Sequence, residues 1–248
     1  PVPGPDADKY SRGVVGLDTG SADFPGAAML GTAGAVHAGA GMVRHLGTGE
    51  VAAKVVERFP NVVPAKGRVQ SLVLGSGWGE RRDGSAVVKA VESGLPVVVD
   101  ADALRHLPGT GGRPGVLLTP HAGELAWLLG CERTEVAADP VAAVLRAAAK
   151  TGCTVLLKGA TQYVAVPGSE VVRLAVPGPA WTAQAGSGDT LAGICDALLA
   201  AGLDAADAAL AAASVQALAA SEHPGPLPPQ ELAERLPAVI AGLVAHAD

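Results

Sequence analysis

The stretch LPVVVDAD, Leu95 to Asp102, is apolar until it ends in two carboxylates. Three more runs have the same character: SLVLGS from Ser71, GVLLTP from Gly115 and TVLLKG from Thr154. None of the four alternates between apolar and polar residues, so both faces of each predicted strand must be covered. The runs are therefore typical of buried parallel strands.

Segments with a helical pattern separate and follow these runs, at 84–93, 123–129, 140–150, 189–201, 204–221 and 230–245. Strand and helix in alternation predict an α/β fold, with a mainly parallel sheet and helices on both faces. Two further runs, TQYVAVPG and EVVRLAVPG, are joined by PGSE and predict a hairpin, hence an antiparallel edge. Because no internal repeat is present, we predict one domain over 13–248 after a linker or tail over 1–12.

The composition excludes several classes of protein. Of the 248 residues, 49% are apolar, 17% charged and 3% aromatic, so the chain is not disordered and small residues must supply the packing. The formal charge of -6, with Lys and Arg scattered, argues against a nucleic-acid groove. The segment 24–43 lacks charged residues, but Pro25, Thr32, His37 and five glycines favour a buried helix and turn over a membrane span.

The cysteines indicate a reducing compartment. Cys131, Cys153 and Cys195 have no CxxC partner, so neither a disulfide framework nor a thiolate zinc site is indicated. No secretory pattern opens the chain, and a cytoplasmic protein is expected. The chain begins at Pro1 with PVPGPDAD, a linker composition that suggests a processed chain or a separated fragment.

In a parallel sheet, ligands bind beyond the carboxyl ends of the strands, and AQAGSGDTLAG forms one such junction. Gly186 and Gly188 admit a ligand against bare backbone, and the free amides of the following helix suit an anion. Asp189, in the first turn of the helix, would be ionised and able to accept a proton. A plain turn capped by Ser187 or Asp189 explains the same residues, and neither a Walker A loop nor GxGxxG is present.

Two other junctions carry glycines or a lysine. In LLKGATQ, the Lys158 ammonium can neutralise a polyphosphate and the amides after Gly159 can cradle it, unless the lysine extends into solvent. LGSGWG, Leu74 to Gly79, admits a phosphate, a ribose or a ring, or is a structural turn.

Polar side chains end the remaining strands. Asp100 stands where a cation or a substrate hydroxyl is usually held, whereas Asp102 is placed to cap the helix ADALRHL. His121 is either a polar loop residue or a catalytic group, and Glu124 favours a first helical turn. No second His or Cys stands at ligand spacing, so no metal ligand is assigned. Together, the glycines, the lysine and the carboxylates on one sheet edge indicate phosphoryl transfer with a nucleotide.

Several blocks follow one another along the chain: KYSRGVVGLDTGSADFPGAAMLGTAGAVHAGAGMVR, LGSGWG, VVVDADAL, LLTPHAGE, LLKGATQ and TAQAGSGDTLAG. In this order they resemble the ADP-dependent NAD(P)H-hydrate dehydratase family, the carboxyl-terminal domain of a bifunctional nicotinamide nucleotide repair enzyme. The resemblance covers nearly the whole chain and implies a ribokinase-like three-layer sandwich. It also implies a lyase that removes water from NADH or NADPH hydrate with ADP, or in some members ATP, as co-substrate.

The resemblance implies the site residues as well. It implies that Asp189 is the catalytic base that takes the hydroxyl proton, and that Mg²⁺ bridges the phosphates. The implied nucleotide-binding residues are Lys158, Gly159, Ala160, Thr161, Gln162, Gly186, Ser187 and Gly188, and the implied hydrate-binding residues are Ala27, Gly77, His121 and Asp189. Ala122 replaces the usual proline, and the residues before GSGD depart from the family pattern, so nucleotide contacts from Pro179 to Gln184 are not carried over.

The family further implies a homo-oligomer, with a tetramer expected, and a fused or cooperating NAD(P)H-hydrate epimerase, without nucleic acid or membrane as partner. Two rival functions stay open. One is a ribokinase-like kinase for a thiazole or pyrimidine alcohol, and the other is a nucleotide-binding protein without catalysis, in which Asp189 is only a cap. The amino-terminal block and TPHAGE favour the dehydratase.

Overall fold

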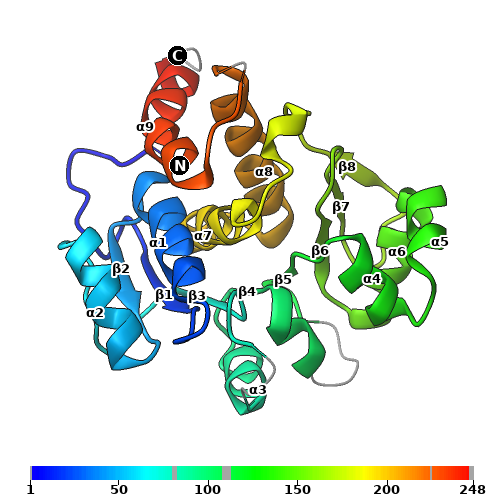
Figure 1. Ribbon diagram of the computed structural model, residues 1–248, viewed down its shortest axis with the longest axis horizontal. Coiled ribbons are helices and arrows are strands. Elements are labelled where there is room, and N and C mark those ends of the chain that lie inside the picture. The colour runs from blue at the N-terminus through cyan, green and yellow to red at the C-terminus, as the bar shows by residue number, and fades with distance from the viewer. Residues whose placement is uncertain (1, 80–82, 108–112, 224, 246–248) are drawn as a thin grey trace.

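The computed structural model describes residues 2–79, 83–107, 113–223 and 225–245. Its strands join one eight-stranded sheet in the order β2-β1-β3-β4-β5-β6-β7-β8 (Figure 1). The strands are β1 (Val14–Asp18), β2 (Met42–His45), β3 (Ser71–Leu74), β4 (Val97–Val99), β5 (Val116–Leu118), β6 (Thr154–Leu157), β7 (Tyr163–Ala165) and β8 (Val172–Leu174). Neighbours from β2 to β6 pair in parallel, whereas β7 and β8 are antiparallel, which confirms the predicted sheet and its edge.

The helices confirm the predicted segments to within two residues at each end. They are α1 (Pro25–His37), α2 (Gly49–Arg58), α3 (Ser85–Glu92), α4 (Ala122–Leu129), α5 (Arg133–Ala138), α6 (Pro140–Thr151), α7 (Ser187–Ala200), α8 (Ala205–Ser221) and α9 (Pro229–Ala245). The predicted helix ADALRHL forms as the 3-10 turn η1 (Ala101–His106). The helix α2, the short α5 and the 3-10 turn η2 (Ala180–Thr182) were not predicted; α5 and η2 have too few turns to show an apolar period. Among the described helices, none combines the length and apolarity needed to cross a membrane.

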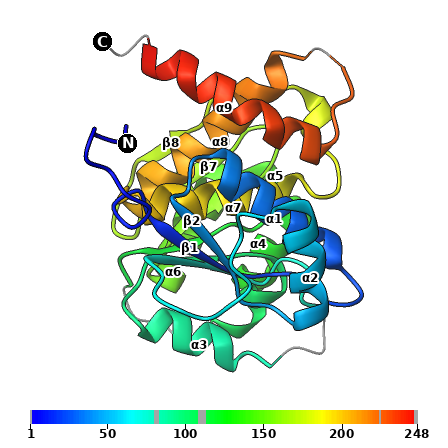
Figure 2. The same ribbon diagram turned by 90° about the vertical axis from the view of Figure 1, so that its left-hand side faces the viewer.

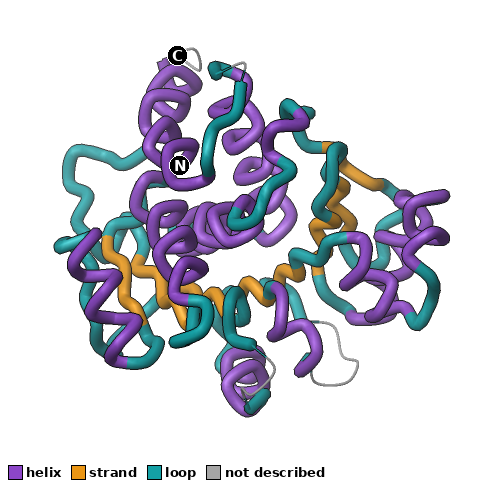
Figure 3. Tube along the Cα trace, in the orientation of Figure 1, coloured by secondary structure: helices purple, strands orange, loops and turns teal. Residues whose placement is uncertain are grey.

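The helices cover both faces of the sheet (Figure 3). Val73, Val98, Leu117 and Leu156 belong to one buried cluster, which they share with α1, α7, α8 and α9. Their neighbours along the same strands point to the opposite cluster, which they share with α3, α4 and α6. This alternation of side-chain direction explains why the four strands are apolar at every position. Figure 2 shows α9 lying outside α1 and α8, its two main contacts.

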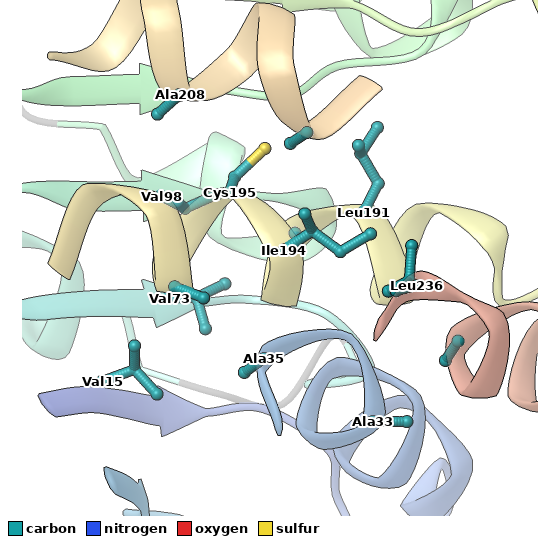
Figure 4. Close-up of a cluster of buried hydrophobic side chains, with 14 of the residues drawn as sticks. Val15, Ala33, Ala35, Val73, Val98, Leu191, Ile194, Cys195, Ala208 and Leu236 are labelled. Atoms are coloured by element: carbon teal, nitrogen blue, oxygen red, sulfur yellow. The ribbon is translucent and has the colours of Figure 1, made fainter. Parts of the chain in front are cut away.

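Small residues let α7 and α1 approach closely. Figure 4 shows Ala33 and Ala35 of α1 in the same cluster as Leu191 and Ile194 of α7. A β-carbon at Gly34 would overlap the carbonyl oxygen of Thr190, and one at Gly193 would overlap the carbonyl oxygen of Gly31. Backbone therefore packs directly on backbone here, and this contact fixes the position of α7 over the sheet.

One acidic side chain of α7 lies inside the core. Asp196 is fully buried, and neither carboxyl oxygen has a hydrogen-bond partner among the described residues. Burial raises the pKa of Asp196 well above its usual value, against a smaller opposing effect of the Ser71 hydroxyl. Folding therefore favours the protonated form of this carboxyl group.

The glycine contact predicts an asymmetry between two substitutions in α1. Gly34→Ala should destabilise the protein by about 1–3 kcal/mol, because the methyl group forces α1 and α7 apart. Gly26→Ala is the matched control, since nothing lies within 4 Å of a β-carbon there. Urea unfolding of both variants measures the difference, and equal stability would contradict direct backbone packing.

The buried Asp196 predicts a pH-dependent effect of Asp196→Asn. The pKa of this carboxyl is higher in the folded chain than in the unfolded chain, so stability is lost as the pH rises above about 4 towards the folded-state pKa. The amide variant lacks this loss, and its melting temperature relative to the parent should therefore increase between about pH 4.5 and pH 8. A difference that stays constant with pH would show that Asp196 is not protonated in the fold.

Candidate active site

The candidate site lies at the carboxyl edge of the parallel strands, where the loops after β3 to β6 meet the start of α7. The Lys158 amide donates to the Pro120 carbonyl at 2.8 Å, and His121 and Lys158 form an isolated parallel bridge. The loops after β5 and β6 are thereby held side by side. This arrangement confirms the expectation that the junction residues gather at one edge.

The start of α7 is a turn without a side-chain cap. Gly186 occupies the N-cap position with a φ of 91°, a left-handed conformation that favours glycine. The Ser187 hydroxyl donates to the Thr182 carbonyl at 2.7 Å, and Asp189 lies in the first turn with no capping bond. The prediction that Ser187 or Asp189 caps this helix is therefore wrong. The Ser187 amide donates weakly to the Gln184 carbonyl at 3.3 Å, whereas no side chain caps the amides that follow, and these are available to an anion.

Asp189 is a part-buried carboxylate with a raised pKa. Burial, and next the nearby charge of Asp100, raise the pKa of Asp189 to about 6, while Lys158 opposes the shift. Among the described residues, this carboxylate forms no ion pair within 4 Å and no side-chain hydrogen bond. At neutral pH, Asp189 is therefore mostly ionised and has the basicity that a general base requires.

Asp100 accepts three hydrogen bonds from three neighbouring strand ends. Its carboxylate accepts from Ser76 Oγ at 2.8 Å, from Thr119 Oγ1 at 2.7 Å and from Lys158 Nζ at 2.6 Å. The residue is 1% exposed, so this is a buried ion pair with its remaining lone pairs satisfied. Lys158 does not extend into solvent, which excludes that alternative. Burial is the largest single effect and lowers the pKa of Lys158, but the charges of Asp100, Glu124 and Asp189 and the hydrogen bond to Asp100 together outweigh it, so the net pKa is raised.

A cavity of about 490 Å³ adjoins the start of α7. Its lining includes the predicted nucleotide residues Lys158, Gly159, Ala160, Gln162, Ser187 and Gly188, together with His121. Gly186 and Thr161 are not part of the lining, although both belong to its loops. A larger apolar cavity of about 630 Å³ lies under the amino-terminal segment and shares no residue with these loops.

Sequence reasoning missed part of this cavity. Pro179, Ala180, Thr182, Ala183 and Gln184 line it, although their departure from the family pattern had led us to omit contacts from this segment. Their positions are held by backbone hydrogen bonds, since the Thr182 amide donates to the Pro179 carbonyl at 3.1 Å and the Ala183 amide to the Ala180 carbonyl at 3.0 Å. Backbone position, unlike side-chain identity, leaves no local pattern in a sequence.

His121 is the N-cap of α4. Its Nδ1 accepts from the amides of Gly123 at 3.0 Å and Glu124 at 3.1 Å, and the Glu124 carboxylate accepts from the His121 amide at 2.8 Å. This capping box confirms the first-turn role of Glu124. His121 also lines a second hollow of about 200 Å³, beside Arg105 and Trp127, so the imidazole stands between two hollows.

The predicted hydrate-binding residues Ala27 and Gly77 are neighbours. A β-carbon built at Gly77, whose φ is 66°, would lie against the Ala27 side chain and the Phe24 carbonyl. The Asp102 carboxylate accepts the Gly79 amide at 2.8 Å, and so it ties the two loops together instead of capping η1. The N-cap position of η1 belongs to Asp100.

The sheet, its antiparallel edge and the glycine turn before α7 define a ribokinase-like α/β protein. A ribokinase-like superfamily protein of Enterococcus faecalis shares this fold, with a TM-score of 0.84 and 20% identity over 97% of this chain and 91% of that one. A family model described as NAD(P)H-hydrate dehydratase matches residues 15–237. The chain belongs to this family.

Relatives agree with this assignment. The bifunctional NAD(P)H-hydrate repair enzyme Nnr of Mycobacterium tuberculosis is 44% identical over 84% of this chain and 45% of its own length. The ADP-dependent (S)-NAD(P)H-hydrate dehydratase of Xanthomonas campestris is 36% identical over 90% of this chain and 84% of its own. The chain thus spans about half the length of the bifunctional relatives.

A solved structure is also similar. The ADP/ATP-dependent NAD(P)H-hydrate dehydratase of Bacillus subtilis, co-crystallised with ATP and Mg²⁺, has a TM-score of 0.89 and 26% identity. The similarity covers 98% of this chain and 94% of that one.

The capping box predicts different effects of two substitutions at His121. His121→Ala removes the acceptor for two helix amides and should destabilise the protein by about 1 kcal/mol. His121→Asn retains a side-chain oxygen that can accept from the same amides, so its stability should stay close to that of the parent. Chemical denaturation of both proteins measures the difference. Equal losses in the two variants would show that capping is not what His121 contributes to the fold.

Proposed function

We propose that this chain restores NADH or NADPH from the corresponding hydrate by ADP- or ATP-dependent dehydration. The observation that carries the proposal is the Asp189 carboxylate, unpaired and with a pKa of about 6, one residue from the uncapped amides that line the cavity. A base and an anion site therefore lie next to each other. This combination suits the transfer of a phosphoryl group to a substrate hydroxyl.

The chemistry follows from the poor leaving ability of hydroxide. In the first step, the hydrate hydroxyl oxygen attacks the terminal phosphorus of ADP, the bond from that phosphorus to the AMP oxygen breaks, and Asp189 takes the hydroxyl proton. In the second step, the ring nitrogen lone pair expels phosphate and the adjacent ring carbon loses a proton. The products are NAD(P)H, AMP and phosphate, so water leaves the ring only after its oxygen has become part of a good leaving group.

The residues of α7 and β6 would serve the nucleotide. Amides from Gly186 to Gly188 can donate to the transferring phosphoryl oxygens, and the Lys158 ammonium lies beside Gly188. The loop Gly159, Ala160, Thr161 and Gln162 follows directly and would bind the rest of the nucleotide. Ala27, Gly77 and His121 would then contact the hydrate.

Mg²⁺ fits this site as an ion bound to the nucleotide phosphates. Among the described residues, no group of three or more His, Cys, Asp or Glu side chains is placed to hold a metal ion. Magnesium needs no such cage, because it retains waters and binds nucleotide phosphates directly. When bound, it would neutralise charge on those phosphates, and no side chain of this chain is assigned to it.

Partners are inferred from the relatives. Because the bifunctional relatives are named as repair enzymes and are about twice as long, an epimerase acting beside this chain would convert hydrate of the wrong configuration into substrate. We also expect a homo-oligomer, with a tetramer as the specific proposal. Light scattering of the purified chain measures this state directly.

One assay separates the proposed dehydratase from the two rival functions. The chain is incubated with NADH hydrate and ADP, and in parallel with ATP, while the absorbance of restored NADH is followed. A dehydratase restores NADH and forms AMP from ADP. A kinase that retains the alcohol consumes nucleotide without restoring NADH, and a pure binder changes neither compound.

Within this assay, Asp189→Asn should lower turnover by about 10²-fold or more, because the amide cannot accept the hydroxyl proton. ADP binding, measured by calorimetry, should remain largely intact. The matched control is Asp139→Asn at the exposed N-cap of α6, which should leave turnover unchanged. Turnover near the parent value in Asp189→Asn would remove Asp189 from the role of base.

A further inference from the structure

Lys158 lies within reach of two carboxylates but pairs with one. Its Nζ is 2.6 Å from Asp100 Oδ1 and would be only 3.2 Å from a β-carbon at Gly188, the residue directly before Asp189. Asp189 is nevertheless absent from the ion pairs found within 4 Å among the described residues. The ammonium could in principle bridge both carboxylates, but in the structure it pairs with Asp100 and leaves Asp189 unpaired.

The surroundings of Asp100 explain which acid holds the ammonium. Ser76 and Thr119 donate to its carboxylate from the ends of β3 and β5. These two bonds hold the carboxylate in place independently of its bond to Lys158 at the end of β6. The next residue, Ala101, has a φ of 47°, the one positive value at a non-glycine position in the described chain. Such backbone strain persists only where the surrounding structure over-determines it. Asp100 is therefore held rigidly, and its ion pair fixes the position of the Lys158 ammonium.

Few other charges compete at this point. The groups that act on Asp189 are Asp100 and Lys158, and Glu124 of α4 acts on Lys158 as well. On the helices packed against α7, α1 contains no Asp, Glu, Lys or Arg, and the acid of α8, Asp207, pairs with Arg173. The remaining ionisable groups on packed elements are Asp18 of β1, His37 of α1, Cys195 and Asp196 of α7, and Glu231, Glu234 and Arg235 of α9.

We propose that Asp100 is a positioning residue that holds the Lys158 ammonium away from Asp189, so that the Asp189 carboxylate is left to accept the proton of the substrate hydroxyl. The inference rests on the proposed function for its catalytic meaning. Asp100 itself contacts neither the hydroxyl nor the nucleotide in this role. It acts through the position of Lys158.

Removal of the Asp100 charge should redirect the lysine. A buried ammonium needs a charged partner, and after Asp100 the carboxylates that act on Lys158 are Glu124 and then Asp189. Glu124 already accepts from the His121 amide, so Asp189 is the carboxylate that is free to pair. A new Lys158–Asp189 pair would stabilise the ionised form of Asp189 and make it a weaker base. The expected signature is therefore a lower titration midpoint together with slower turnover, while the nucleotide site itself stays formed.

The test is Asp100→Asn, with the Asp189 midpoint measured by ¹³C-carboxyl NMR and with Asp189→Asn used to assign the signal. The midpoint should fall from about pH 6 by about one unit or more. Turnover at pH 7.5 should fall about ten-fold or more, and the acid limb of the pH–rate profile should move in the same direction. ADP binding in Mg²⁺-free buffer should persist.

The matched control is Asp102→Asn, which removes a carboxylate two residues away and should leave the Asp189 midpoint in place. Asp100→Ser is a second variant that removes the same charge. If neither Asp100 variant folds, Lys158→Met carries the test, because loss of the ammonium should move the Asp189 midpoint upward.

Two results would overturn the inference. In the first, Asp100→Asn melts at a lower temperature but titrates Asp189 as the parent does, which leaves Asp100 with a structural role alone. In the second, Lys158→Met leaves the midpoint unchanged. Since the NMR titration needs no turnover, an inactive parent protein would contradict the proposed function and not this inference.

Discussion

At Gly34 and Gly193, α1 and α7 approach until the backbone of one helix meets the backbone of the other. No side chain separates them, so the axis of α7 has little freedom to shift. The uncapped amides and Asp189 stand at the first turn of that helix, over the carboxyl edge of the sheet. The anion site and the candidate base are therefore placed by helix packing some distance from where the chemistry would occur.

The second constraint is electrostatic. Four adjacent strand ends contribute Ser76, Asp100, Thr119 and Lys158 to one buried hydrogen-bonded group. The single ammonium in this group satisfies Asp100, and Asp189 is left with a pKa of about 6. Asp100 and Asp189 both lie near Lys158 in space, but only Asp100 also accepts from the neutral donors Ser76 and Thr119. Asp100 therefore forms the ion pair and Asp189 does not.

The sequence predicted the edge of the sheet at which the site lies, because three of the four apolar runs end in a glycine, a lysine or a carboxylate and His121 follows the fourth. It could not choose between roles for single residues. The local sequence around Lys158 is compatible both with a side chain in solvent and with one in an ion pair. Which of the two forms depends on Asp100, which lies 58 positions away. The lining by Pro179 to Gln184 escaped prediction for a related reason, since it depends on the path of the backbone.

The sequence by itself determined the α/β class, the antiparallel edge, the order of the junctions and, through its resemblance, the family. These features are local: they depend on periodicity, on turn residues and on short motifs. Only the tertiary structure decided that α7 is uncapped, that Asp102 ties two loops together and that Lys158 pairs with Asp100 rather than Asp189. Those outcomes depend on contacts between segments far apart in the chain, and the energy of a buried charge depends on all of its neighbours at once.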